Sequence, residues 1–331
     1  MKRHALNRAR WWLGTLAIGL LIGSAAAETQ LAERDVRYKE RQRLSGSHRV
    51  LRNLEYAIVD GVSLRLDLYL PHPLPPEPLP LVVWVHGGGW RAGSKDRTLA
   101  PEALGEAYAV ASVAYRLSDV AIFPAQIHDV KAAVRWLRAH ATDHGIDPDR
   151  FGAWGSSAGG HLVALLGTSC GTEALEGAAG DGLDVSSCVQ AVCDFYGPTD
   201  LLVLIDQESR VNRRMSASYP EALLLGGTVA ERPELARLAS PITHVDATDP
   251  PFLIVHGDED STVPVEQSID FHAALVEAGV DTTLRIVVGA GHGGFQAEVA
   301  PEVKTFFDAH LRGLAPAGLT LRRDPNDERR P

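Results

Sequence analysis

Residues 151–160 of the chain read FGAWGSSAGG. The first four are typical of a short buried strand, whereas residues 158–166 are typical of a helix. Between them lies a G-x-S-x-G pentapeptide with Ser157 at its centre. The chain must turn sharply there, and only glycine fits two residues before and two residues after the serine without a Cβ clash. We therefore expect the hydroxyl of Ser157 to stand above a sheet edge, beside a helix N-terminus; the alternative is a glycine-rich turn without a chemical role.

The sequence on both sides of this stretch alternates strands with helices. Continuous apolar runs, which are typical of strands covered on both faces, occur at 81–85, 109–115, 189–195 and 251–255. Segments with helical periodicity separate several of them. This order predicts an α/β fold, in which a mostly parallel sheet carries helices on both faces. We place this domain at residues 54–312.

Residues 1–27 differ from the rest of the chain. They begin with four Lys or Arg residues, continue with an apolar run at 11–23 and end in small residues at 24–27. This arrangement is typical of a signal peptide, and it predicts a secreted or periplasmic protein. The alternative is an uncleaved membrane anchor, for which the apolar run is short.

Three further segments lie outside the regular alternation. Residues 28–53 are rich in charge and are predicted to form a solvated lead-in, and residues 313–331 are predicted to form a disordered tail. Residues 201–248 are predicted to form a cap-like excursion over the strand ends, as one wall of a pocket. The alternative for this excursion is a loose surface insertion.

The charge of the chain limits its partners. The 331 residues include 32 Lys and Arg against 42 Asp and Glu, for a net charge of −10. Residues 1–27 hold four basic side chains and no acid, so their removal gives −10 − 4 = −14. An acidic surface argues against nucleic acid or an anionic membrane as the partner. No later segment is apolar for long enough to cross a membrane, so we expect no stable membrane insertion after cleavage.

Three cysteines are present, and two of them flank a loop. Cys170 and Cys188 enclose residues 171–187, which are rich in Gly, Ala and acids, whereas Cys193 lies in an apolar run. Export makes a disulfide chemically possible, so we predict a Cys170–Cys188 bond and a buried Cys193; the alternative is three free thiols. No CxxC motif and no Cys/His metal spacing occurs, so we expect no metal.

A second glycine motif, HGGGW at 86–90, follows an apolar run directly. Bare backbone N–H groups of this kind can stabilise negative charge that develops on a carbonyl oxygen. We assign this role to Gly88, Gly89 and the N–H of Ala158. The alternative is a phosphate-binding loop, which normally leads into a helix with a Lys-Ser/Thr pattern. We predict that Trp90 is pocket wall rather than core.

Two more strand ends carry ionisable residues. HGDED at 256–260 follows the run at 251–255, and His292 lies within the glycine-rich segment 289–294. We predict that Asp260 is the carboxylate that orients His292, and Asp258 is the alternative. If the segment has no catalytic role, it is a solvated acidic turn. The order Ser157, Asp260, His292 follows three separate strands and predicts a nucleophile, an acid and a base at one sheet edge.

These motifs resemble the hormone-sensitive-lipase-like esterases. Together with residues 112–117 (SVAYRL) and 194–200 (DFYGPTD), they resemble more closely the bacterial group of bifunctional feruloyl and acetyl-xylan esterases. The resemblance covers about residues 53–312. It implies the α/β-hydrolase fold with an eight-stranded sheet, and a serine carboxylic-ester hydrolase that needs no cofactor.

The resemblance specifies the substrate poorly. It implies a short-chain acyl or aryl ester of the acetyl or feruloyl type, either a small molecule or linked to a polysaccharide. The loop at 171–187 departs from the family pattern, and we expect it near the site, where it would alter substrate preference. The alternatives are a serine peptidase of the prolyl-oligopeptidase type and a non-catalytic ligand-binding protein on the same fold.

Overall fold

The computed structural model describes residues 42–45, 47–204 and 219–315. The predicted signal peptide, most of the lead-in, part of the excursion and residues 316–331 of the predicted tail lie outside this described part. Within it, no helix combines the length and the apolar character that a membrane crossing requires.

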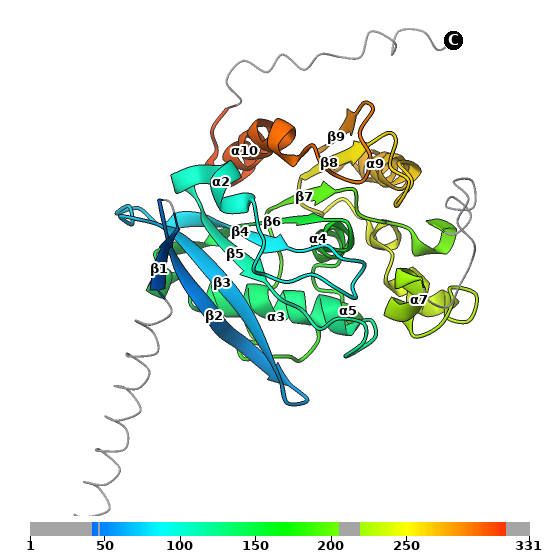
Figure 1. Ribbon diagram of the computed structural model, residues 1–331, viewed down its shortest axis with the longest axis horizontal. Helices are drawn as coiled ribbons and strands as arrows, with labels where there is room; N and C mark the ends of the chain where they lie inside the picture. The colour runs from blue at the N-terminus through cyan, green and yellow to red at the C-terminus, as the bar shows by residue number, and fades with distance from the viewer. Residues whose placement is uncertain (1–41, 46, 205–218, 316–331) are drawn as a thin grey trace, which may run out of the picture.

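The centre of the molecule is one twisted sheet (Figure 1). Its strands, in the order β1-β2-β3-β5-β4-β6-β7-β8-β9, are β1 (Gln42–Ser45), β2 (His48–Val59), β3 (Val62–Pro71), β4 (Leu79–Val85), β5 (Ala109–Val113), β6 (Ile146–Ser156), β7 (Ala191–Phe195), β8 (Phe252–Gly257) and β9 (Thr282–Val287). Pairing is antiparallel from β1 to β3 and between β3 and β5, and parallel from β5 to β9. The predicted mostly parallel α/β-hydrolase sheet is confirmed in β2–β9.

The strand β1 extends this sheet by a ninth strand, which sequence analysis had placed in the solvated lead-in. The first residues of β2 also lie in that segment, where Val50 and Leu51 are fully buried. Val50 and Leu51 pack into the cores on opposite faces of the sheet, because consecutive side chains of a strand point to opposite faces. The prediction of a solvated lead-in is therefore wrong for residues 48–53.

Helices cover both faces of the sheet (Figure 1). They are α2 (Ala100–Leu104), α3 (Ala125–Ala139), α4 (Ala158–Thr168), α5 (Glu173–Glu176), α7 (Pro220–Leu225), α8 (Pro233–Leu238), α9 (Glu266–Ala278) and α10 (Gln296–Arg312), with three short 3₁₀ turns at Gly105–Ala107, Thr142–His144 and Pro241–His244. The core on one face includes residues of α3, α4 and α9, and the core on the other face includes residues of α2 and α10.

Strand β4 is continuously apolar because both of its faces are covered. Leu81, Val83 and Val85 pack into the core on the α3 and α4 side, whereas Val82 and Trp84 pack into the core on the α10 side. Since alternate side chains point to opposite faces, both sets must be apolar when both faces are covered.

The described part of the excursion is packed against the domain. Leu224, Leu225 and Ala236 are fully buried in the core that also contains α3 and α4. A loose surface insertion would leave these side chains exposed, so this part of the chain is integral to the fold.

The predicted disulfide is present. Cys170 and Cys188 are bonded, with their Cα atoms 5.2 Å apart, and Cys193 is a buried free thiol. Closing a loop with a sequence separation of 18 residues stabilises the fold by about 3 kcal/mol in the chain-entropy model.

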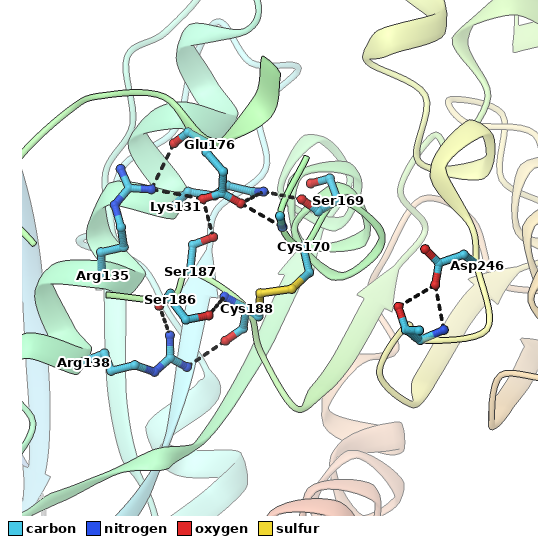
Figure 2. Close-up of a disulfide and its surroundings, with 12 residues drawn as sticks. Lys131, Arg135, Arg138, Ser169, Cys170, Glu176, Ser186, Ser187, Cys188 and Asp246 are labelled. Atoms are coloured by element: carbon cyan, nitrogen blue, oxygen red, sulfur yellow. Dashed lines mark hydrogen bonds and ion pairs between the residues drawn. A yellow bond between two sulfur atoms is a disulfide. The ribbon is translucent and has the colours of Figure 1, made fainter. Parts of the chain in front are cut away.

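Buried charge holds the same loop against α3 (Figure 2). Lys131 is fully buried and donates hydrogen bonds to the carbonyl oxygen of Ser169 at 2.5 Å and to Glu176 Oε1 at 2.7 Å. Arg135 is 2% exposed and donates to the carbonyl oxygen of Glu176 at 3.0 Å. Burial lowers the pKa of Lys131, and the Glu176 carboxylate partly offsets this effect. Loss of Glu176 would leave two buried cations without their carboxylate, so the loop conformation depends on this residue.

Candidate active site

The turn between β6 and α4 holds Ser157 in a conformation that L-residues rarely adopt. Its φ is 55° and its ψ is −122°. A Cβ added to Gly155 would lie 2.2 Å from the carbonyl oxygen of Gly159, and one added to Gly159 would lie 2.1 Å from that of Val85. Gly155 is therefore required for the close approach of the two arms of the turn, and Gly159 for the close approach of the turn to the end of β4. The strained residue presents its hydroxyl at the carboxyl end of the sheet.

The structure brings Ser157, His292 and Asp260 into one hydrogen-bonded chain. The distance from Ser157 Oγ to His292 Nε2 is 2.9 Å, and that from His292 Nδ1 to Asp260 Oδ2 is 2.6 Å. In neutral His292 the Nδ1–H donates to the carboxylate and Nε2 accepts from the serine hydroxyl. The alternative acid, Asp258, instead accepts a hydrogen bond from the N–H of Gly289 at 2.6 Å.

Asp260 is buried and held from several sides. It accepts hydrogen bonds from the N–H groups of Thr262 at 2.7 Å and Val263 at 3.0 Å, and His256 Nε2 lies 3.2 Å from Oδ2. Burial raises the pKa of Asp260, but hydrogen bonds with His256 and His292 and the charge of His292 outweigh it, so the pKa is below its usual range. The carboxylate therefore stays ionised at neutral pH, as a partner of an imidazolium must.

The glycine loop after β4 faces Ser157. Gly88 and Gly89 have φ values of 118° and 59°, and a Cβ on Gly88 would lie 2.3 Å from the carbonyl oxygen of Ala92. Among the described residues, none accepts a hydrogen bond from the N–H of Gly88, Gly89 or Ala158. These three donors are thus available to an oxygen atom bound beside Ser157.

The predicted position of Trp90 in the pocket wall is wrong. Its side chain is 3% exposed and lies in the core, where Nε1 donates to His161 Nδ1 at 3.1 Å and the two rings meet edge to face at 5.1 Å. The φ of Trp90 is 54°, a backbone conformation that turns the indole beneath the glycine loop. An indole N–H that is buried needs an acceptor, and His161 provides it.

Two other histidines support the same loop. His161 is fully buried and its Nε2 donates to the carbonyl oxygen of Ala239 at 2.7 Å; burial lowers its pKa to about 4. His86 stacks on Tyr115 at 4.4 Å, and its Nδ1 lies 2.8 Å from the carbonyl oxygen of Gly87. Burial lowers the pKa of His86 as well. Both rings therefore have a structural role beneath the glycine loop.

Tyr196 and Gln296 were not recognised from the sequence. Tyr196 has a φ of 43° and packs its ring edge to face against His292 at 4.6 Å. Gln296 Nε2 donates to the Tyr196 hydroxyl at 2.6 Å, and Gln296 Oε1 accepts from the N–H of Gly294 at 2.9 Å. Gln296, at the start of α10, therefore fastens the loop that carries His292 to Tyr196. Only the position of Tyr196 directly after a strand could have suggested it.

A pocket of about 370 Å³ opens at the serine. It is lined by Gly87, Gly88, Gly89, Arg91, Ser156, Ser157, Tyr196, Pro220, Thr262 and His292. Pro220 belongs to α7, so the excursion does contribute one wall. Within the described part of the chain, no group of three or more His, Cys, Asp or Glu side chains is arranged to hold a metal ion.

The loop at 171–187 does not lie at this pocket. Its residues Ala178, Ala179 and Gly180 instead line a separate groove of about 780 Å³, together with the end of β2 and the start of α3. Helix α4 begins beside Ser157 and spans 11 residues, about 16 Å at 1.5 Å per residue, before Cys170 and the loop follow. The expectation that this loop lies near the site is therefore wrong.

Comparison with known proteins identifies the family of this chain. The fold and the relatives place the chain among the α/β-hydrolase esterases. The chain belongs to the BD-FAE family, whose model matches residues 66–275. The resemblance to hormone-sensitive-lipase-like esterases is thereby confirmed at the level of the family.

Individual relatives extend this result. Esterase LipC of Mycobacterium tuberculosis is 32% identical over 238 residues, which cover 71% of this chain and 58% of LipC. Esterase LipQ of the same organism is 32% identical over 70% of this chain and 54% of its own length. The chain thus spans little more than half the length of these curated relatives.

Two solved structures match this chain over nearly the whole of their own length. A truncated carbohydrate esterase from gut microbiota is 33% identical, with a TM-score of 0.74 over 82% of this chain and 99% of the other. Esterase Est2 of Thermogutta terrifontis is 30% identical, with a TM-score of 0.64 over 82% of this chain and 95% of its own.

The buried His161 predicts a pH dependence of stability. Its folded pKa of about 4 lies below the ordinary 6.5, so the unfolded chain binds the proton first as pH falls. Its contribution is complete above pH 6.5 and is lost toward pH 4, by roughly 3 kcal/mol. As the pH falls from 6.5 to 4, we expect the free energy of unfolding of His161→Gln to decrease less than that of the wild type. Denaturant titration at several pH values measures this. If the free energy of unfolding of His161→Gln fell with pH as steeply as that of the wild type, the lowered pKa of His161 would be contradicted. The control is His72→Gln, at an exposed histidine.

The link between Gln296 and Tyr196 predicts an effect on turnover. Gln296→Leu removes both hydrogen bonds while keeping the side-chain volume, so the His292 loop loses a constraint worth about 1 kcal/mol. We expect kcat for p-nitrophenyl acetate to fall about fivefold with little change in KM. Glu298→Gln, exposed on the same helix, is the control. A rise in KM with unchanged kcat would show that Gln296 does not position the imidazole.

Proposed function

We propose that the protein is a serine carboxylesterase that works through an acyl-enzyme. The observation that carries the proposal is the hydrogen-bonded chain from Ser157 through His292 to the ionised Asp260, opposite three backbone N–H groups that have no acceptor in the described part of the protein. This arrangement supplies a nucleophile, a base and a site for negative charge around one pocket.

In the first step Ser157 Oγ attacks the carbonyl carbon of the ester while its proton passes to His292 Nε2. The carbonyl oxygen becomes negatively charged and accepts hydrogen bonds from Gly88, Gly89 and Ala158. Each such donor is worth about 3 kcal/mol of barrier. Asp260 stabilises the imidazolium through the 2.6 Å contact with Nδ1.

In the second step the tetrahedral species collapses. The C–O bond to the alcohol breaks, and the alcohol takes the proton from His292. A water molecule then loses a proton to His292 as it attacks the acyl carbon, and the carboxylic acid leaves Ser157 with its proton restored. Every proton transfer uses the same imidazole, which is why its orientation by Asp260 matters.

The substrate that we propose is a short-chain acyl or aryl ester of the acetyl or feruloyl type, as a small molecule or on a polysaccharide. The volume of about 370 Å³ supports a short acyl group. Est2 of Thermogutta terrifontis has been solved with propionate and with butyrate. An acetyl ester-xyloside bifunctional hydrolase from Caldicellulosiruptor lactoaceticus, 26% identical, has a TM-score of 0.62 over 77% of this chain.

Two other functions fit the fold less well. A peptidase of the prolyl-oligopeptidase type would share the order of the three side chains, but the relatives named above are esterases. A ligand-binding protein has no need for the Ser157–His292 contact of 2.9 Å or for a buried ionised carboxylate behind it.

Ser157→Ala tests the proposal. We expect kcat for p-nitrophenyl acetate to fall by at least about 10⁴-fold while the circular dichroism spectrum stays unchanged, because only the nucleophile is lost. The anilide of acetic acid, assayed beside the ester, separates an esterase from a peptidase. Ser94→Ala, at an exposed serine, is the control. Retained ester hydrolysis in the Ser157 variant would refute the mechanism.

We further propose that the protein is exported and that residues 1–27 are removed. The Cys170–Cys188 bond supports this proposal, because structural disulfides persist in oxidising compartments. N-terminal sequencing of the protein recovered outside the cytoplasm is expected to begin at Glu28. A first residue of Met1 would contradict cleavage.

A further inference from the structure

The pocket at Ser157 contains one permanent charge. Of its ten lining residues, Arg91 alone carries a guanidinium cation. The other ionisable groups in the lining are His292, which is engaged with Ser157 and Asp260, and the Tyr196 phenol, which is bonded to Gln296. The guanidinium is therefore the dominant electrostatic feature that a bound substrate meets.

This guanidinium has no partner in the described part of the chain. Its side chain is exposed and makes no ion pair or hydrogen bond with any described residue. Arg116, by contrast, donates from Nε and Nη2 to Asp129 at 2.9 and 2.7 Å, and Arg52 donates to Asp67 at 2.6 Å. The N–H donors of the Arg91 guanidinium, in the same pocket as Ser157, are therefore available to bind a ligand.

The backbone of Arg91 is held in place by the turn that forms the glycine loop. The N–H groups of Arg91 and Ala92 both donate to the carbonyl oxygen of Gly88, at 3.2 and 3.1 Å. The preceding Trp90 is buried and anchored to His161. The distance between the base of the Arg91 side chain and the N–H groups of Gly88 and Gly89 is therefore set by a tight turn, and only the side chain is free to adapt.

We propose that Arg91 binds a carboxylate carried by the substrate, so that this site prefers esters with an acidic group on the acyl or the alcohol part. The inference rests on the proposed esterase function. A guanidinium pairs with a carboxylate through two parallel hydrogen bonds, which fix orientation as well as attract charge. Because the chain as a whole carries a net charge of −10, an anionic substrate needs a local cation such as this one.

The size of the effect follows from exposure. The Arg91 side chain is exposed, so solvent screens its charge. We therefore expect a contribution to kcat/KM of about two- to fivefold, that of a well-placed exposed ion pair. The same charge should disfavour esters of cationic alcohols. Both effects should weaken in 0.5 M NaCl, at which the screening length is only a few ångströms.

Matched ester pairs test the inference. For the alcohol part, 4-acetoxybenzoate is compared with 4-acetoxybenzamide; for the acyl part, mono-4-nitrophenyl adipate is compared with 4-nitrophenyl pentanoate. Ratios of kcat/KM within each pair are measured for the wild type, Arg91→Gln and Arg91→Lys. We expect Arg91→Gln to lower the ratio of anionic to neutral ester about two- to fivefold in at least one pair, with the Lys variant between.

The control is Arg97→Gln, since Arg97 is exposed on the same loop but does not line the pocket. The pair that responds identifies which side of the ester carries the carboxylate. An unchanged ratio in both pairs overturns the role of Arg91 while hydrolysis of the neutral esters leaves the esterase proposal intact. Absence of hydrolysis of all four esters by the wild type would instead contradict the esterase proposal itself.

Discussion

The site depends on one steric constraint, the close approach of β4, the end of β6 and the start of α4. Gly155 and Gly159 leave no room for a Cβ, and Ser157 between them takes a φ of 55°. This geometry places the hydroxyl above the sheet and leaves the N–H of Ala158 without an acceptor in the described part. A larger residue at either glycine would separate the strands and move the nucleophile from both the imidazole and the glycine loop.

Two sets of contacts maintain the geometry around that turn. Beneath the glycine loop, Trp90 and His161 form a buried pair whose last hydrogen bond reaches Ala239 in the excursion. Behind the imidazole, Tyr196 and Gln296 connect the His292 loop to α10. Neither set exchanges a proton or forms a bond in the proposed mechanism, yet each fixes a group that does.

The loop at 171–187 belongs to a different part of the molecule. A disulfide and the ion pairs of Lys131 and Arg135 with Glu176 hold it against α3, at the far end of α4 from Ser157. Three of its residues line a surface groove that is separate from the pocket at Ser157. Arg91, Thr262 and Pro220, by contrast, do line the pocket at Ser157.

The amino-acid sequence by itself determined the sheet class, the disulfide partners, the nucleophile Ser157 and the base His292. Each was signalled by a local pattern: an apolar run, two cysteines that flank a loop, a glycine turn, and a histidine among glycines. The tertiary structure decided what depends on contacts between distant segments. It selected Asp260 over Asp258 through the 2.6 Å contact with His292, buried Trp90, added β1 to the sheet and joined Gln296 to Tyr196. Local patterns indicate where the backbone forms strands, helices and turns. The hydrogen bonds between Trp90 and His161 and between Tyr196 and Gln296 join residues that are 71 and 100 positions apart, so they form only once the chain has packed.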